Sequence, residues 1–490
     1  MAVNLKSYFK LSLLYIMIAA FPPVLQIIVQ PFIEGSDRLN AVDFSHIAIT
    51  ESIGVISMIL SALAMGNALV RYYYDYMDDH KKFSILVSGT FNSIVFRGGI
   101  LIILCYIFRD YVGRLFTQPA LRDFASYGVA TVGIGVSRAI NIAAANLFRN
   151  QKKVMEFVWL SIAMGAFRVC FQLIGLFYFE MSFRGYVFGS CIGGWIVSAG
   201  VLAYTYYHYG FSYNRKSLRP LYVFAIPLFQ YVLLTWGLRF IDRFFLESNP
   251  VDLGIYDTVM KFALGIELIM IGINGAVRPE VFRYMKDGTQ KHQFDIKRLS
   301  NVFLAQVQII IAMAVFPVML YINYLFETDI RFAYKITTIV FARYILQAQY
   351  LIFLMPVYYK KKTRAMFWIN SIGLIFNIGF NYWLIPIFSY YGAIASALLT
   401  QFILVQLMYF YQKRISGISW NLSKTYFFPL GIIALTVIGE FIKNIFSLND
   451  YIMSGLLVIL ICASLLILYG KDINRKKIIH QFNGEHEQHV

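Results

Sequence analysis

The chain has 490 residues, of which 59% are hydrophobic and only 14% are charged. Soluble domains carry about 25% charged residues, so this composition excludes a soluble protein. The formal net charge is +17, but the basic residues lie in short loops beside apolar stretches. That arrangement indicates the orientation signal of a membrane protein, and no nucleic-acid partner is expected.

Apolar stretches long enough to cross a bilayer fill the chain almost from end to end. The first has a basic flank like a signal peptide, but it continues past Pro22 and Pro23 to Phe32, so we interpret it as an uncleaved span. The sequence therefore predicts an all-α polytopic membrane protein with about 14 transmembrane helices. They are expected at 9–32, 44–70, 84–108, 123–148, 155–178, 183–208, 219–247, 253–282, 299–326, 331–358, 364–387, 390–412, 425–446 and 450–470.

The gaps between these spans alternate in charge. Odd-numbered gaps hold acids such as Glu34, Asp252 and Glu327, whereas even-numbered gaps are rich in Lys and Arg, as at 149–153 and 360–364. By the positive-inside rule this pattern places both termini in the cytoplasm and requires an even number of spans.

No gap exceeds about 20 residues. Membrane glycosyltransferases, acyltransferases and polysaccharide polymerases are the enzyme alternatives, and such polymerases and glycosyltransferases usually carry a large catalytic loop. The short gaps therefore favour a transporter and no enzymatic activity. The four cysteines all lie in apolar stretches, so neither a metal site nor a disulfide framework is expected.

A shift of about 209 positions partly superimposes the sequence on itself. Residues 40–45 match 249–254 at a shift of 209, and residues 184–190 match 391–397 at a shift of 207. This shift covers six spans, so the two halves have the same topology and are related by an axis along the membrane normal. Internal symmetry of this kind is typical of transporters, whose substrate site lies between the halves.

Four segments of the second half resemble a known family. The resemblance rests on Pro227 followed by WGLRFIDR at 236–243 and LGIYDTVMKFA at 253–263, and on NIGFNYWLIP at 377–386 followed by YGAIASA at 391–397. These resemble the seventh–eighth and eleventh–twelfth helix patterns of the polysaccharide-transporter branch of the multidrug/oligosaccharidyl-lipid/polysaccharide exporter superfamily. The likeness covers the whole chain in topology and about 120 residues in motif.

The resemblance implies two six-helix lobes, a central cavity and alternating access. We expect an N-terminal lobe at 1–211, a linker at 212–218, a C-terminal lobe at 219–414, two extra helices within 415–470 and a cytoplasmic tail at 471–490. The implied function is a flippase that moves an undecaprenyl-diphosphate-linked oligosaccharide from the cytoplasmic to the outer leaflet of the bacterial inner membrane. The same-superfamily alternative is an ion-coupled exporter of small molecules. Expected partners are membrane lipids and the polymerase and chain-length machinery of polysaccharide biosynthesis, and a monomer is expected.

Cations inside the spans are costly unless they face a cavity or a partner. Arginine can hold a lipid diphosphate in a bidentate manner. Four arginines without a local partner in their own spans are the first candidates for substrate binding, and three further cations of the seventh and eighth spans, each near an acid, follow them. The seven are Arg97, Arg138, Arg168, Arg343, Arg239, Arg243 and Lys261.

Uphill transport needs a coupling ion, either H⁺ or Na⁺, which would make the protein an antiporter that uses no other cofactor. Buried carboxyls titrate closer to neutral pH. The candidates, in order, are Glu51, Glu267 and Glu440. Separately, Gly185, Gly189 and Gly193 form a small-residue ladder that predicts close helix packing.

Overall fold

The computed structural model describes residues 5–76, 78–179, 182–470 and 472. Within these residues, twelve helices are long and apolar enough to cross a membrane. One of them, α13 (Thr363–Ser416), contains two expected spans separated by a kink at Ser389, and α1 (Leu5–Ile33) supplies the remaining one. The prediction of an all-α polytopic membrane protein is confirmed. Apart from Asp472, the expected tail at 471–490 lies outside the described residues.

The chain divides into two compact units. Unit 1 comprises residues 1–258 together with 325–331 and 378–393, and unit 2 comprises 259–324, 332–377 and 394–490. Two short segments of the second half of the sequence therefore pack with the first half. The lobe boundaries expected from the sequence remain a prediction.

Unit 1 contains the first eight helices, α9 and the start of α10. The helices that follow α1 in the chain are α2 (Ala41–Ala62), α3 (Met65–Tyr76), α4 (His80–Gly113), α5 (Pro119–Arg122), α6 (Phe124–Asn150), α7 (Val154–Ile174) with its π-helical end Gly175–Phe179, α8 (Phe183–Tyr209), α9 (Arg215–Leu246) and α10 (Pro250–Gly288).

Unit 2 contains the rest of α10 and the helices that follow it. These are α11 (Gln293–Leu325), the 3₁₀ segment Asp329–Ile336, of which the first three residues belong to unit 1, α12 (Thr337–Tyr359), both ends of α13, the π-helical turn Ser423–Phe427, α14 (Phe428–Phe446), α15 (Asp450–Ser464) and the π-helical segment Leu465–Tyr469.

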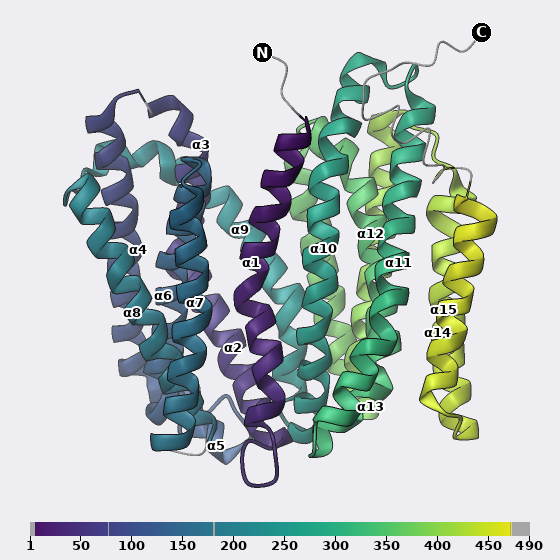
Figure 1. Ribbon diagram of the computed structural model, residues 1–490, viewed down its shortest axis with the longest axis horizontal. Helices are drawn as coiled ribbons and strands as arrows, with labels where there is room; N and C mark the ends of the chain where they lie inside the picture. The colour runs from purple at the N-terminus through teal and green to yellow at the C-terminus, as the bar shows by residue number, and fades with distance from the viewer. Residues whose placement is uncertain (1–4, 77, 180–181, 471, 473–490) are drawn as a thin grey trace. The chain divides into compact units, whose positions relative to one another are not determined.

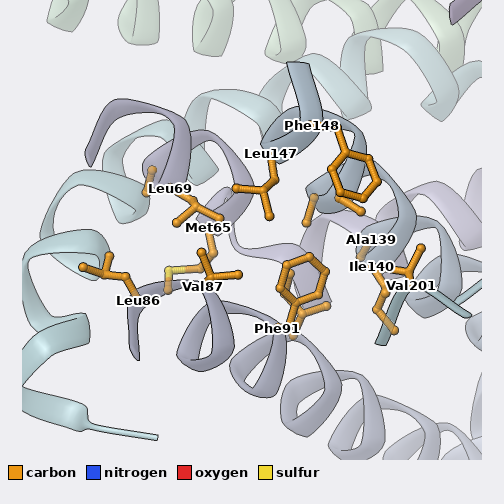
Figure 2. Close-up of a cluster of buried hydrophobic side chains, with 14 of the residues drawn as sticks. Met65, Leu69, Leu86, Val87, Phe91, Ala139, Ile140, Leu147, Phe148 and Val201 are labelled. Atoms are coloured by element: carbon orange, nitrogen blue, oxygen red, sulfur yellow. The ribbon is translucent and has the colours of Figure 1, made fainter. Parts of the chain in front are cut away.

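Helix α6 forms the centre of unit 1. It packs against α2, α4 and α8, and 78% of its apolar window is buried, compared with 28% for α4. Figure 1 shows α4, α6, α7 and α8 running side by side. The core between them is drawn in Figure 2, where Phe91 of α4 faces Ile140 and Leu147 of α6. A helix buried on most of its surface cannot turn a charge to lipid, so a charge on α6 must meet protein or water.

The span expected at 44–70 is broken into two helices. Helix α2 ends at Ala62, and α3 begins at Met65. Between them Leu63 and Ala64 have φ of 45° and 55°, a left-handed backbone that is unfavourable for residues with a side chain. Hydropathy alone did not reveal the break, because the apolar residues continue through it.

The internal repeat is visible in equivalent helix starts. Asn40 caps α2, with its side chain accepting the N–H groups of Val42 and Asp43, and Asn249 directly precedes α10 at the predicted shift of 209. Ser182 caps α8, and Ser389, shifted by 207, occupies the kink of α13 with φ of 49°. These equivalent positions support the two matches on which the repeat was inferred.

Glycines bring α7 and α8 into backbone contact, as the ladder predicts. A Cβ atom added at Gly189 would lie 2.0 Å from Phe171 O, and one at Gly193 would lie 2.5 Å from Phe167 O. Only glycine permits such an approach.

Candidate functional site, an arginine–glutamate cluster

Three of the predicted site residues meet inside unit 1. Glu51 lies on α2, Arg138 on α6 and Arg168 on α7. Nη2 of Arg138 lies 2.8 Å from Oε1 and 2.7 Å from Oε2 of Glu51. Arg168 donates from its own Nη2 to Glu51 Oε1. The three residues are far apart in sequence and come together because α6 packs against both α2 and α7.

The cluster carries an excess of positive charge. Two guanidinium groups share one carboxylate, and Nε of Arg168 is buried with no hydrogen-bond partner among the described residues. The side chains of Glu51, Arg138 and Arg168 retain 27%, 17% and 22% of their surface exposed, so the cluster is open to a small ligand or to water. An anion at this position would balance the charge and accept the unused N–H.

A chain of hydrogen-bonded amide and hydroxyl groups, most of them buried, lies next to the cluster. Tyr186 Oη donates to Gln26 Oε1 at 2.9 Å, and Gln26 Nε2 donates to Gln172 Oε1 at 2.8 Å. Gln172 Nε2 in turn donates to Ser190 Oγ at 2.7 Å. These hydrogen bonds join α1, α7 and α8, and Gln26 is the most accessible of the four residues.

The sequence analysis did not select these neutral residues. One sequence pattern could have identified Gln26. Gln26 and Gln30 lie four positions apart within an apolar span, and this spacing places them on the same helix face. Polar side chains in a span usually hydrogen-bond to another helix, and Gln30 Nε2 donates to Thr258 Oγ1 at 3.2 Å.

Arg97, expected to line a cavity, holds the broken end of α2. Its Nε donates to Ser61 O at 2.8 Å and its Nη2 to Ala62 O at 3.2 Å. Its Nη1 donates to Tyr222 Oη at 2.9 Å. The last carbonyls of a helix lack intrahelical partners, so these contacts give Arg97 a structural task. A role in substrate binding stays a prediction.

Arg243 occupies a second charged cluster, formed by α9 and the start of α10. It is 5% exposed and contacts Asp257 at 2.8 Å and Asp242 at 3.2 Å. Tyr256 Oη donates to the other oxygen of Asp242 at 2.5 Å. The spacing of Arg239 to Asp242 and of Asp257 to Lys261 also allows pairing along one helix. The structure shows that Asp242 and Asp257 share Arg243 as a partner, which the spacing alone did not indicate.

The remaining predicted site residues lie outside the arginine–glutamate cluster. Arg239 on α9 stacks on Phe240, with 5.7 Å between its guanidinium carbon and the ring centre. In unit 2, Lys261 and Glu267 are half-buried on α10, and Arg343 is half-buried on α12, 5.7 Å from the ring centre of Tyr344.

Glu440 also lies in unit 2, on α14. It is 5% exposed and pairs with Lys443, which also lies 2.8 Å from Asp450 of α15. This arrangement ties α14 to α15. The use of Glu440 or Glu267 in ion coupling is still a prediction.

Several solved structures share this fold. The lipid II flippase MurJ in an inward closed conformation has a TM-score of 0.68 and 14% identity, covering 96% of this chain and 99% of that chain. An inward-facing multidrug resistance MATE family transporter of the MOP superfamily has a TM-score of 0.64 and 11% identity, covering 83% and 98%. A mutant of the Vibrio cholerae MATE transporter VcmN has a TM-score of 0.57 and 14% identity, covering 84% and 97%.

The protein is therefore a multi-pass membrane protein with the fold of MOP-superfamily exporters. The resemblance inferred from the motifs is confirmed at the level of this superfamily fold. No protein-family model and no curated protein sequence matches the chain. The structures that the chain resembles are those of transporters and flippases, and its membrane-length helices agree with that class.

Proposed function

We propose that the protein is a flippase for an undecaprenyl-diphosphate-linked oligosaccharide. It carries the lipid-linked repeat unit of a polysaccharide from the cytoplasmic to the outer leaflet of the bacterial inner membrane. Alternating access coupled to H⁺ or Na⁺ drives the movement, and both termini lie in the cytoplasm. The protein forms no chemical bond in its substrate and hands it to the polymerase and chain-length machinery.

The observation that carries this proposal is the charge of the arginine–glutamate cluster. Two arginines share one glutamate, and no acceptor in the described part of the chain binds the buried Nε–H of Arg168. A diphosphate supplies negative charge and several acceptor oxygens, so it complements this arrangement. The half-buried amide of Gln26, at the accessible end of the neighbouring hydrogen-bonded chain, is placed to contact a sugar.

The first test is genetic. Deletion of the gene should leave the lipid-linked repeat unit on the cytoplasmic leaflet, where an impermeant sugar-oxidising reagent added to intact cells does not reach it. Normal export of the surface polymer by a deletion strain without a paralogue would contradict the proposal.

The second test uses purified protein in liposomes with a fluorescent undecaprenyl-diphosphate oligosaccharide. Arg168→Gln should slow flipping by about tenfold to a hundredfold, because one to two charge-assisted hydrogen bonds are lost. Arg168→Lys should retain part of the activity, since the charge remains while the planar fork is lost. Arg184→Gln is the matched control, because Arg184 forms a more exposed pair with Asp123 at 2.8 Å. Equal rates for all three variants would argue against the cluster as the binding site.

A small-molecule exporter is the second candidate, favoured by the MATE transporters among the solved structures with this fold. A net-positive cluster disfavours cationic drugs. Efflux of a cationic dye by the same liposomes, without movement of the lipid-linked oligosaccharide, would support this candidate over the flippase.

A further inference from the structure

Two buried glutamates without a basic partner bind backbone N–H groups at one end of unit 1. Glu34 is 1% exposed, and its carboxylate accepts the N–H of Glu327 at 2.9 Å and that of Thr328 at 2.7 Å. No cation lies within salt-bridge distance of Glu34 among the residues that the structure describes.

Glu247 repeats this arrangement. It is 3% exposed and accepts the N–H of Thr117 at 3.0 Å, the N–H of Gln118 at 2.8 Å and the hydroxyl of Thr117 at 2.6 Å. Gln118 also donates from Nε2 to Glu247 O at 2.6 Å. Over the described parts of the chain, this carboxylate also lacks a salt-bridge partner. We name these two sets of contacts the carboxylate latches.

The internal repeat relates the two latches. Glu34 follows the first helix of the first half and Glu247 follows the first helix of the second half, 213 positions later. The partners of Glu247, at 117–118, follow α4, and the partners of Glu34, at 327–328, follow α11, 210 positions later. Each latch therefore joins a carboxylate from one half of the sequence to a loop from the other half. Each half thus supplies one carboxylate and one partner loop at equivalent positions. The contact is therefore a feature of the repeated architecture and does not belong to a single loop.

The carboxylate of each latch has two energetically favourable states. With the N–H groups in place, the buried carboxylate is satisfied. Once they withdraw, the carboxylate must be hydrated, because a buried charge without partners is strongly unfavourable. A latch is therefore either hydrogen-bonded and inaccessible to water or separated and hydrated. Two such alternative states are what a gate requires.

We propose that Glu34 and Glu247 are gate residues of the transport cycle. The positive-inside rule predicts that the end of unit 1 carrying Glu34 and Glu247 faces the outside. The two latches hold this outer end closed, and both release when the substrate leaves to the outside. This inference rests on the proposed transport function, but it concerns the protein's own movement and is independent of the substrate's identity.

The first experiment measures opening without any substrate. In a background with the four cysteines replaced by serine, Met58→Cys reports access, since Met58 lines a cavity of about 120 Å³ between α2, α3, α6 and α9. The combined change Glu34→Gln and Glu247→Gln should raise its labelling by an impermeant thiol reagent from outside by about tenfold, because the amide has no negative charge and replaces one of the two acceptor oxygens with an NH₂ donor. The single variants should give intermediate rates. Unchanged labelling in the double variant, at normal expression and thermal stability, would overturn the inference.

The second experiment holds one latch closed. Glu34→Cys and Thr328→Cys joined by a short reducible cross-linker should stop transport, and reduction should restore it. Asp123→Cys and Arg184→Cys, joined in the same way, are the matched control, since they pair within the first half at 2.8 Å and should remain active. Full transport by the cross-linked latch would overturn the inference. If the latch variants change labelling as expected but no lipid-linked oligosaccharide moves, the substrate assignment fails and the gate stands.

Discussion

At the scale of single residues, each charge inside a membrane span needs a partner or water. Arg138 and Arg168 avoid the cost of burial by sharing Glu51, and Arg97 avoids it by binding the last carbonyls of α2. The cost argument predicted that these arginines need a partner or a cavity. It could not choose between the two, because the partners of these arginines lie 35 to 125 positions away.

Glu51→Gln tests the coupling role of the cluster. The amide leaves two guanidinium groups without a negative charge between them, so we expect a loss of about 1–3 kcal/mol in the free energy of unfolding. If Glu51 carries the coupling proton or contacts the coupling sodium, flipping by this variant should no longer respond to an imposed H⁺ or Na⁺ gradient. Thermal unfolding and liposome flipping with and without the gradient measure the two effects.

Asp75→Asn is the control for that variant. Asp75 forms an exposed pair with Arg71 at 3.2 Å, and such pairs contribute about 1 kcal/mol or less. If flipping by Glu51→Gln still depends fully on the H⁺ or Na⁺ gradient, Glu51 is not the coupling residue, and Glu267 and Glu440 become the candidates.

At the scale of elements, the break between α2 and α3 is specified by contacts more than by local sequence. Neither Leu63 nor Ala64 favours the left-handed backbone that both adopt. Arg97 stabilises the break by donating hydrogen bonds to the carbonyls of Ser61 and Ala62 at the end of α2. Nothing in the apolar pattern of 44–70 distinguishes such a break from a continuous helix, so sequence reasoning missed it.

Ala64→Gly should stabilise the protein by up to about 1 kcal/mol, because glycine adopts a left-handed backbone without steric cost. Arg97→Met should destabilise it by about 2 kcal/mol, because the carbonyls of Ser61 and Ala62 lose their donor. Thermal unfolding in detergent measures both. A destabilised Ala64→Gly variant would show that the methyl group of Ala64 contributes more to packing than its backbone angle costs.

The α7–α8 contact offers a matched pair of glycines on one helix. Gly189→Ala should cost about 1–3 kcal/mol, because the new Cβ atom would lie 2.0 Å from Phe171 O. Gly200→Ala on the same helix should be neutral or stabilising, since no atom lies within 4 Å of its added Cβ. Equal melting temperatures for the two variants would mean that α7 and α8 move apart at little cost.

At the scale of the whole molecule, the topology remains to be tested by labelling. A cysteine at Lys361, between α12 and α13, should resist an impermeant thiol reagent added to intact cells, whereas one at Asp37, between α1 and α2, should react. Reaction at Lys361 from outside would reverse the predicted orientation, and with it the direction assigned to the latches.

Hydropathy and charge alternation predicted the number of spans and the fold class, because the bilayer imposes both on the sequence directly. The repeat matched residues 40–45 with 249–254, and in the structure Asn40 and Asn249 directly precede α2 and α10. Periodicity along the chain could not predict that 325–331 and 378–393 pack with the first half, nor that Glu34 and Glu247 are buried. Both depend on contacts between residues that are more than 100 positions apart.

The latch at Glu34 also has a consequence for how the protein is made. Glu34 leaves the ribosome 293 residues before its first partner, Glu327. At a synthesis rate of about 5–20 residues per second, about 15–60 s pass before the N–H groups that bind this carboxylate have been made. During that time the first half of the chain must insert with this end hydrated, and unit 1 is completed only after residue 393 has been added. Biogenesis of the protein therefore cannot proceed as the independent folding of one half followed by the other.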